Sequence, residues 1–118
     1  MHDVSTLDAK DIRRTMPRFA PDNYAANLQL LTPYKAIAQE VGCTPSRLAL
    51  AWLLHKGEHI IPIPGTTREA HLMDDLGAAD VTLDASVMAR LEALINEKTV
   101  TGNRYNEQGS REVDTEAF

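Results

Sequence analysis

The stretch IIPIPGTTREAHLMDDL, residues 60–76, decides how this chain is expected to fold. Residues 59–63, from His59 just before this stretch, predict one short strand, and Pro62 suits the end or edge of that strand because proline has no N–H to donate. Gly65 provides a turn, and residues 67–77 predict a helix that begins at Thr66 or Thr67. The sequence therefore predicts a strand, a glycine turn and a helix N-terminus in succession.

The turn and the start of this helix combine groups that can bind an anion. The first N–H groups of a helix have no partner within the helix, and they attract negative charge. Gly65 lets an anion approach the backbone, and the Thr66 and Thr67 hydroxyls can donate to phosphate oxygens or cap the helix. Arg68 can hold a phosphate with two hydrogen bonds, and His71 follows about one turn later. Residue chemistry alone leaves both ordinary capping and phosphate binding open.

The segment before this stretch predicts two helices. Apolar residues recur at helical spacing over residues 23–41, but Pro33 is expected to kink or break that helix near Thr32. Thr44 is a good N-cap for a helix over residues 45–56, which is apolar on all sides and is therefore expected to be buried on several of them.

The C-terminal part predicts one further helix and a tail. Asp84 is expected to cap a last helix whose inner face is apolar. Residues 1–22 are polar and uneven and predict a loop region, and residues 101–118 are polar without periodicity and predict a tail. The helices and the strand are expected within residues 23–100. The predicted fold class is mainly α with one short β-strand, in a single partial domain over residues 1–118.

A single strand leaves its backbone groups without partners. Buried backbone N–H and C=O groups need partners, and an open strand edge invites another strand. The strand is therefore expected to pair with a second copy of the chain, or the chain is part of something larger.

Composition narrows the possible partners and the compartment. Twelve basic and 17 acidic residues give a net charge of −5, which argues against a nucleic-acid-binding surface. No apolar run approaches the roughly 20 residues of a membrane span. The N-terminus has no signal-peptide pattern, and the single cysteine, Cys43, cannot form an internal disulfide. We expect a cytoplasmic protein with no nucleic-acid or membrane partner and no metal site.

Four motifs point to a known family. Besides IPIPGTTR at residues 61–68, they are DIRRTMPRF at 11–19, TPSRLALAWLL at 44–54 and GNRY at 102–105. In this order and spacing they resemble the C-terminal part of the aldo-keto reductases. The resemblance implies the last βα unit and flanking helices of a (β/α)8 TIM barrel, in a family that reduces aldehydes and ketones with NADPH.

The resemblance also implies which residues bind the cofactor. Four of them would hold the 2′-phosphate of the adenosine ribose, a fifth would join that pocket, and two carboxylates would lie beside the adenine: Gly65, Thr66, Thr67 and Arg68; His71; Asp74 and Asp75. The family usually has Asn where Asp75 stands, and an ionised Asp cannot donate to adenine.

The family's catalytic Asp, Tyr, Lys and His come from the first half of the barrel, which has no counterpart here. We therefore predict no catalytic residues in this chain. The predicted function is that of a C-terminal fragment of an NADP-dependent aldo-keto reductase, which carries the adenosine 2′-phosphate part of the cofactor site. The alternative is a non-catalytic helical module for oligomerisation or protein interaction. Apolar surface that the missing barrel half would cover predicts a homo-oligomer or a partner chain.

Overall fold

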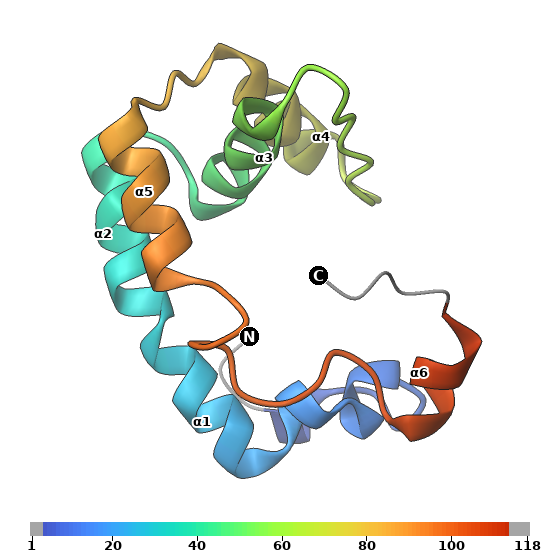
Figure 1. The fold of residues 1–118 in the computed structure, drawn as a ribbon. Coiled ribbons are helices and arrows are strands. Elements are labelled where there is room, and N and C mark those ends of the chain that lie inside the picture. Colours follow the sequence, from blue (N-terminus) through green and yellow to red (C-terminus); the bar gives the residue numbers. More distant parts are fainter. Residues whose placement is uncertain (1–3, 114–118) are drawn as a thin grey trace. The chain divides into compact units, whose positions relative to one another are not determined.

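The structure is a computed structural model that describes residues 4–113. Those residues are mainly helical and contain no β-strand (Figure 1). The α-helices are α1 (Pro21–Gln29), α2 (Leu31–Val41), α3 (Pro45–Lys56), α4 (Glu69–Leu76), α5 (Ala85–Leu94) and α6 (Glu107–Glu112). Short 3-10 helices are η1 (Val4–Thr6), η2 (Ile12–Thr15), η3 (Pro17–Phe19) and η4 (Gly77–Asp80).

The helices divide between two compact units. One unit comprises Leu30–Ile95 and contains α2, α3, α4, η4 and α5. The other contains the described residues before and after that range. No helix within residues 4–113 has the length and hydrophobicity that crossing a bilayer requires.

A small core holds the Leu30–Ile95 unit together around α3. Leu48 and Ala51 of α3 are completely buried. The other buried apolar residues are Ile37, Ala38, Ala78, Leu83, Val87 and Leu91. The core side chains come from all the packed elements except α4, which has no buried residue. Helix α4 is therefore held by its contacts with α3 and η4 and not by insertion into the core.

Local sequence signals set the ends of α2 and α3. Gly42 ends α2 with φ of +80°, a left-handed conformation that glycine adopts without steric penalty. The Thr44 hydroxyl then accepts a hydrogen bond from the Arg47 N–H at 3.1 Å, and Pro45 takes the first helical position. The predicted helix over residues 45–56 is confirmed.

The predicted interruption near Pro33 is also found, two residues earlier than expected. Helix α1 ends at Gln29 and α2 begins at Leu31, so Leu30 separates them. Pro33 lies in the first turn of α2, where a backbone N–H has no partner within the helix. A proline there disturbs the helix little, and the helix therefore starts just before it.

The predicted strand over residues 59–63 was wrong for this chain. The segment is irregular, and Ile61 and Ile63 are 82% and 92% exposed. A strand needs a neighbour for its backbone groups, and residues 4–113 provide none. The barrel architecture implied by the resemblance is therefore not visible in this chain.

The second unit is held by polar contacts of its loops. Asn27 of α1 accepts from the Thr101 N–H at 2.8 Å and donates to the Thr101 carbonyl at 2.9 Å. Phe19 and Tyr24 stack with ring centroids 5.7 Å apart. Helix α6 was not predicted, since residues 101–118 show no apolar periodicity, but the Asn106 side chain caps it.

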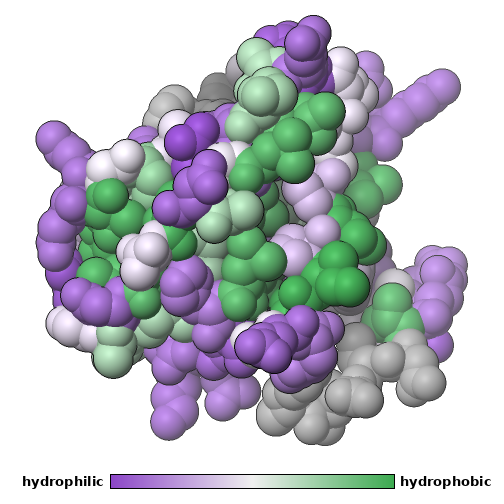
Figure 2. All heavy atoms as spheres, turned by 90° about the horizontal axis from the view of Figure 1, so that it is seen from above, coloured by the Kyte–Doolittle hydropathy of each residue, from purple (hydrophilic) through white to green (hydrophobic). Residues whose placement is uncertain are grey.

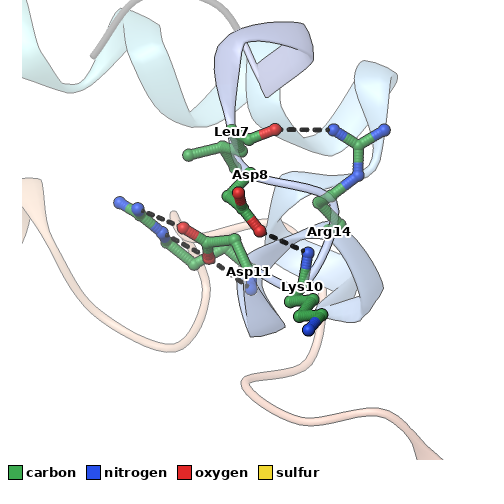
Figure 3. A network of polar contacts seen from close by, with 6 residues as sticks. Leu7, Asp8, Lys10, Asp11 and Arg14 are labelled. Carbon is green, nitrogen blue, oxygen red and sulfur yellow. Dashed lines mark hydrogen bonds and ion pairs between the residues drawn. The ribbon is translucent and has the colours of Figure 1, made fainter.

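Charged residues between Asp8 and Arg14 make local polar contacts in the N-terminal loop (Figure 3). Arg13 pairs with Asp11, which lowers the pKa of that carboxyl to about 2 through their hydrogen bonds. Arg14 donates to the Leu7 carbonyl at 3.0 Å, and Asp8 accepts from the Lys10 N–H at 2.8 Å. These contacts stabilise the turns of the N-terminal loop.

Candidate functional site

The candidate site is the loop that leads into α4 and the first turn of that helix. Residues 63–73 are all exposed, so the loop is open to solvent along its length. Apart from its two chain neighbours, no described residue has an atom within 4 Å of the position that a Cβ would take on Gly65. A ligand can therefore approach the backbone at this glycine closely.

Helix α4 starts later than predicted. Its first residue is Glu69, and Arg68, not Thr66 or Thr67, occupies the N-cap position with φ of −127° and ψ of 130°. The Thr66 hydroxyl accepts from the Arg68 N–H at 3.3 Å and donates to the Arg68 carbonyl at 3.2 Å. This local turn competes with helix geometry, which is why the threonines remain in the loop.

The delayed start leaves donors open at the helix N-terminus. Among the described residues, no side chain caps α4. The N–H groups of Glu69 and Ala70 donate to no acceptor within residues 4–113, while those of His71 and Leu72 bond to the Arg68 carbonyl at 3.1 Å. Glu69 supplies a negative charge in the first turn, which already interacts favourably with the helix dipole.

Two cationic or potentially cationic side chains flank these donors. The Arg68 guanidinium and the His71 imidazole are exposed, and neither hydrogen-bonds or pairs with another described residue. Anion binding by Arg68 therefore stays a prediction. The structure leaves this group available next to open backbone donors.

Asp74 is engaged in a network with α3. Its carboxylate accepts from the Thr44 hydroxyl at 2.7 Å and pairs with the Arg47 guanidinium at 3.0 Å. Arg47 also donates from Nε to the Asp74 carbonyl at 3.0 Å. A Cβ on Gly77 would lie 2.5 Å from Arg47 Cζ, so the guanidinium lies directly against that glycine. Asp74 therefore joins α4 to the start of α3.

The neighbouring Asp75 behaves differently. It is half-buried, and its carboxylate makes no hydrogen bond or ion pair with residues 4–113. The family resemblance placed both aspartates beside the adenine, and nothing in the sequence indicated the ion pair between Asp74 and Arg47. Only the capping signal at Thr44 pointed to this region, because the partners lie about 30 residues apart.

His55 has a structural role. Its Nδ1 lies 2.7 Å from the Ala51 carbonyl oxygen, and its Nε2 accepts from the Leu83 N–H at 3.1 Å. This pattern requires a neutral ring with the proton on Nδ1. No three His, Cys, Asp or Glu side chains gather as a metal site within the part of the chain that the structure describes.

Cys43 and Tyr34 are partly buried beside α3, and burial raises the pKa of both groups. The pKa of the Cys43 thiol is raised, so the reactive thiolate is disfavoured. The pKa of Tyr34 is raised to about 12, and its hydroxyl donates to the Pro45 carbonyl at 2.8 Å. Burial thus favours the neutral form of both groups.

The Leu30–Ile95 unit also carries an open apolar hollow of about 550 Å³ between α2, α3 and α5. Its lining is Leu31, Tyr34, Pro45, Ser46, Ala49, Trp52, Leu53, Leu91 and Ile95. Trp52 packs against the core and also lines this hollow. On the face shown in Figure 2, hydrophobic residues reach the surface among hydrophilic ones. The chain thus exposes apolar surface as well as the polar loop.

Comparison with known proteins supports the family suggested by the motifs. The model of the "Aldo/keto reductase family" matches residues 3–96. An aldo-keto reductase of Strobilurus tenacellus, str7, is 32% identical over 109 residues, which are 92% of this chain and 32% of that protein. Aldo-keto reductase yakc [NADP(+)] of Schizosaccharomyces pombe is 39% identical over 95 residues, which are 80% of this chain and 28% of that protein. The chain spans about a third of the length of these relatives, and it belongs to the aldo/keto reductase family.

Proposed function

We propose that this chain carries the part of an NADP site that holds the adenosine 2′-phosphate. The observation that carries the proposal is the exposed loop from Gly65 to Arg68, whose guanidinium has no partner among residues 4–113 and lies next to the open N–H groups of α4. Family membership supports it, as does the NADP(+) in the name of the Schizosaccharomyces pombe relative.

The chemistry of the loop suits a dianionic phosphate. The Arg68 fork can bind two phosphate oxygens, and the N–H groups of Glu69 and Ala70 can donate to the same anion. His71 adds a donor one turn along α4, and Gly65 allows close approach of the ligand. Asp75 is the free carboxylate of the expected adenine pair, because Asp74 is bound to Thr44 and Arg47.

We further propose that the chain does not reduce carbonyl compounds alone. A hydride-transfer site positions the nicotinamide against the substrate, and in a barrel enzyme it is built from the ends of several strands. Residues 4–113 form no strand. The matched regions cover only about a third of the length of the two relatives. Carbonyl reduction by the rigorously pure chain would contradict this part of the proposal.

The experiment is a fluorescence titration of the purified chain with NADPH and with NADH. We expect NADPH to bind more tightly, and we expect Arg68→Ala to remove the preference. Loss of a charge-assisted contact costs about 1.5–3 kcal/mol, which is roughly a ten- to hundredfold loss of affinity. Arg111→Ala removes an exposed arginine from α6 and serves as the matched control, which should leave both affinities unchanged.

The exposed apolar surface supports a second candidate, a module for oligomerisation or protein interaction. Ile61 and Ile63 are almost fully exposed, and the hollow between α2, α3 and α5 is open. If neither nucleotide binds in the titration, this second function is favoured over the cofactor site.

A further inference from the structure

Arg47 of α3 contacts the C-terminal turn of α4 from outside that helix. Its guanidinium pairs with the Asp74 carboxylate at 3.0 Å, and its Nε donates to the Asp74 carbonyl, also at 3.0 Å. The guanidinium lies against Gly77 as well, where a Cβ would come within 2.5 Å of its Cζ. Arg47 therefore satisfies a carbonyl of the last helical turn, in which carbonyl groups lack partners within the helix.

The last turn of α4 has no cation of its own. It contains Asp74 and Asp75 and no basic residue. The free carbonyl groups give a helix C-terminus a partial negative charge, so carboxylates there are unfavourable and a cation is favourable. Arg47 brings a positive charge to this end from α3, and the Thr44 hydroxyl donates to the second Asp74 oxygen at 2.7 Å. The start of α3 thus compensates the charge at the end of α4.

Helix α4 gains little stability from burial. It is eight residues long, and isolated helices shorter than about 12 residues are marginal in water. None of its residues is buried, and its large apolar side chains, Leu72, Met73 and Leu76, are 45%, 60% and 59% exposed. The polar contacts at Asp74 therefore contribute a large part of what keeps α4 formed and attached to α3.

We propose that Arg47 is a positioning residue for the proposed anion site of residues 65–71, at the opposite end of α4, a role that rests on the proposed function. By capping the C-terminus, Arg47 keeps α4 formed. A formed helix points the N–H groups of Glu69 and Ala70, which have no acceptor within residues 4–113, toward an anion beside Arg68. Arg47 acts through the helix and not by contact with the ligand. Its loss lowers the fraction of chains with a formed α4, and the apparent affinity falls with that fraction.

Amide hydrogen exchange without any ligand tests whether Arg47 caps α4. Arg47→Gln removes the charge, and we expect the amides of α4 to exchange roughly tenfold faster relative to those of α3 and α5. Arg90→Gln is the matched control, since Arg90 of α5 forms a two-bond pair with Glu40 of α2 at 2.8 and 2.9 Å. This control removes a comparable link between helices of the same unit and should leave the relative exchange of α4 unchanged. Unchanged exchange of α4 in Arg47→Gln would overturn the proposal.

Titration with adenosine 2′-monophosphate, followed through the amide resonances of Glu69 and Ala70, tests the positioning role. We expect Arg47→Gln to weaken binding roughly three- to tenfold and Arg90→Gln to leave the affinity unchanged. Arg47→Lys should recover part of the loss, because lysine keeps the charge but lacks the planar fork that reaches the carboxylate and the carbonyl together. An unchanged affinity in Arg47→Gln, or an equal loss in Arg90→Gln, would overturn the proposal.

Two further comparisons keep these results interpretable. The Arg47 side chain is partly exposed, and helical circular dichroism verifies that each variant folds. If Arg47→Gln unfolds, the milder Arg47→Lys carries both measurements, with smaller changes expected in the same directions. A wild-type chain that does not bind adenosine 2′-monophosphate would overturn the proposed function and the role of Arg47 in it. The exchange measurement, which needs no ligand, would still show whether Arg47 caps α4.

Discussion

Removal of the Asp74 carboxylate tests whether this residue stabilises the fold. Asp74→Ala breaks the 2.7 Å bond from Thr44 and the 3.0 Å pair with Arg47, and it leaves the Arg47 guanidinium without its charge partner. A charge-assisted hydrogen bond contributes about 1.5–3 kcal/mol to stability. The Asp74 and Arg47 side chains are 26% and 33% exposed, so solvent weakens the attraction between them. We expect a loss of about 1–2 kcal/mol in the free energy of unfolding.

Urea unfolding followed by circular dichroism measures this loss, with Asp75→Ala as the control. Asp75 is the adjacent carboxylate and makes no such contacts, so its removal should change stability by no more than about 0.5 kcal/mol. A loss of 1–2 kcal/mol corresponds to a fall in Tm of roughly 5–15 °C for a unit of this size. Equal effects of the two substitutions would refute the assignment of Asp74 to the α3–α4 link.

Three further predictions concern the core, a helix end and pH. Leu48→Ala removes the largest completely buried side chain and should cost about 2–5 kcal/mol in urea unfolding, so a loss below about 1 kcal/mol would contradict the core assignment. Gly42→Ala forces a Cβ into a left-handed conformation at φ of +80° and should cost roughly 1 kcal/mol, whereas an unchanged midpoint would argue against this end of α2. Burial raises the pKa of Tyr34 from 10.0 to about 12, so its contribution to stability is complete below pH 10 and is lost as the pH rises toward 12. The stability of the wild type relative to Tyr34→Phe should therefore fall between pH 10 and 12, and a constant difference across that range would be the contrary result.

Capping signals made much of the helical fold predictable. Thr44 and Pro45 defined the start of α3, Gly42 defined the end of α2, and Asp84 defined the start of α5 through its bond from the Val87 N–H at 2.8 Å. Each of these signals acts within three residues of the helix end. Their effect therefore does not depend on the rest of the fold.

The strand and the start of α4 could not be predicted in the same way. A strand at residues 59–63 depends on a neighbour that residues 4–113 do not supply, so its apolar pattern was insufficient. The Thr66 hydroxyl hydrogen-bonds to the Arg68 backbone and does not cap the N-terminus of α4. The same threonine could form either a local turn or a helix cap, so its presence in the sequence does not fix where α4 begins. The helix over residues 107–112 is too short for a periodic pattern to reveal it.

The candidate site was predictable in part. The types and spacing of Gly65, Arg68 and His71 predicted a group of anion-binding residues, and the structure leaves these residues exposed. The role of Asp74 was not predictable, because Thr44 and Arg47 are distant in sequence.

An NMR titration with adenosine 2′-monophosphate tests the central claim most directly, with adenosine as the reference ligand. The account predicts that the phosphorylated ligand shifts the amide resonances of residues 65–71 and that Arg68→Ala abolishes those shifts. Identical shifts with adenosine, or shifts confined to residues outside the loop and α4, would contradict it.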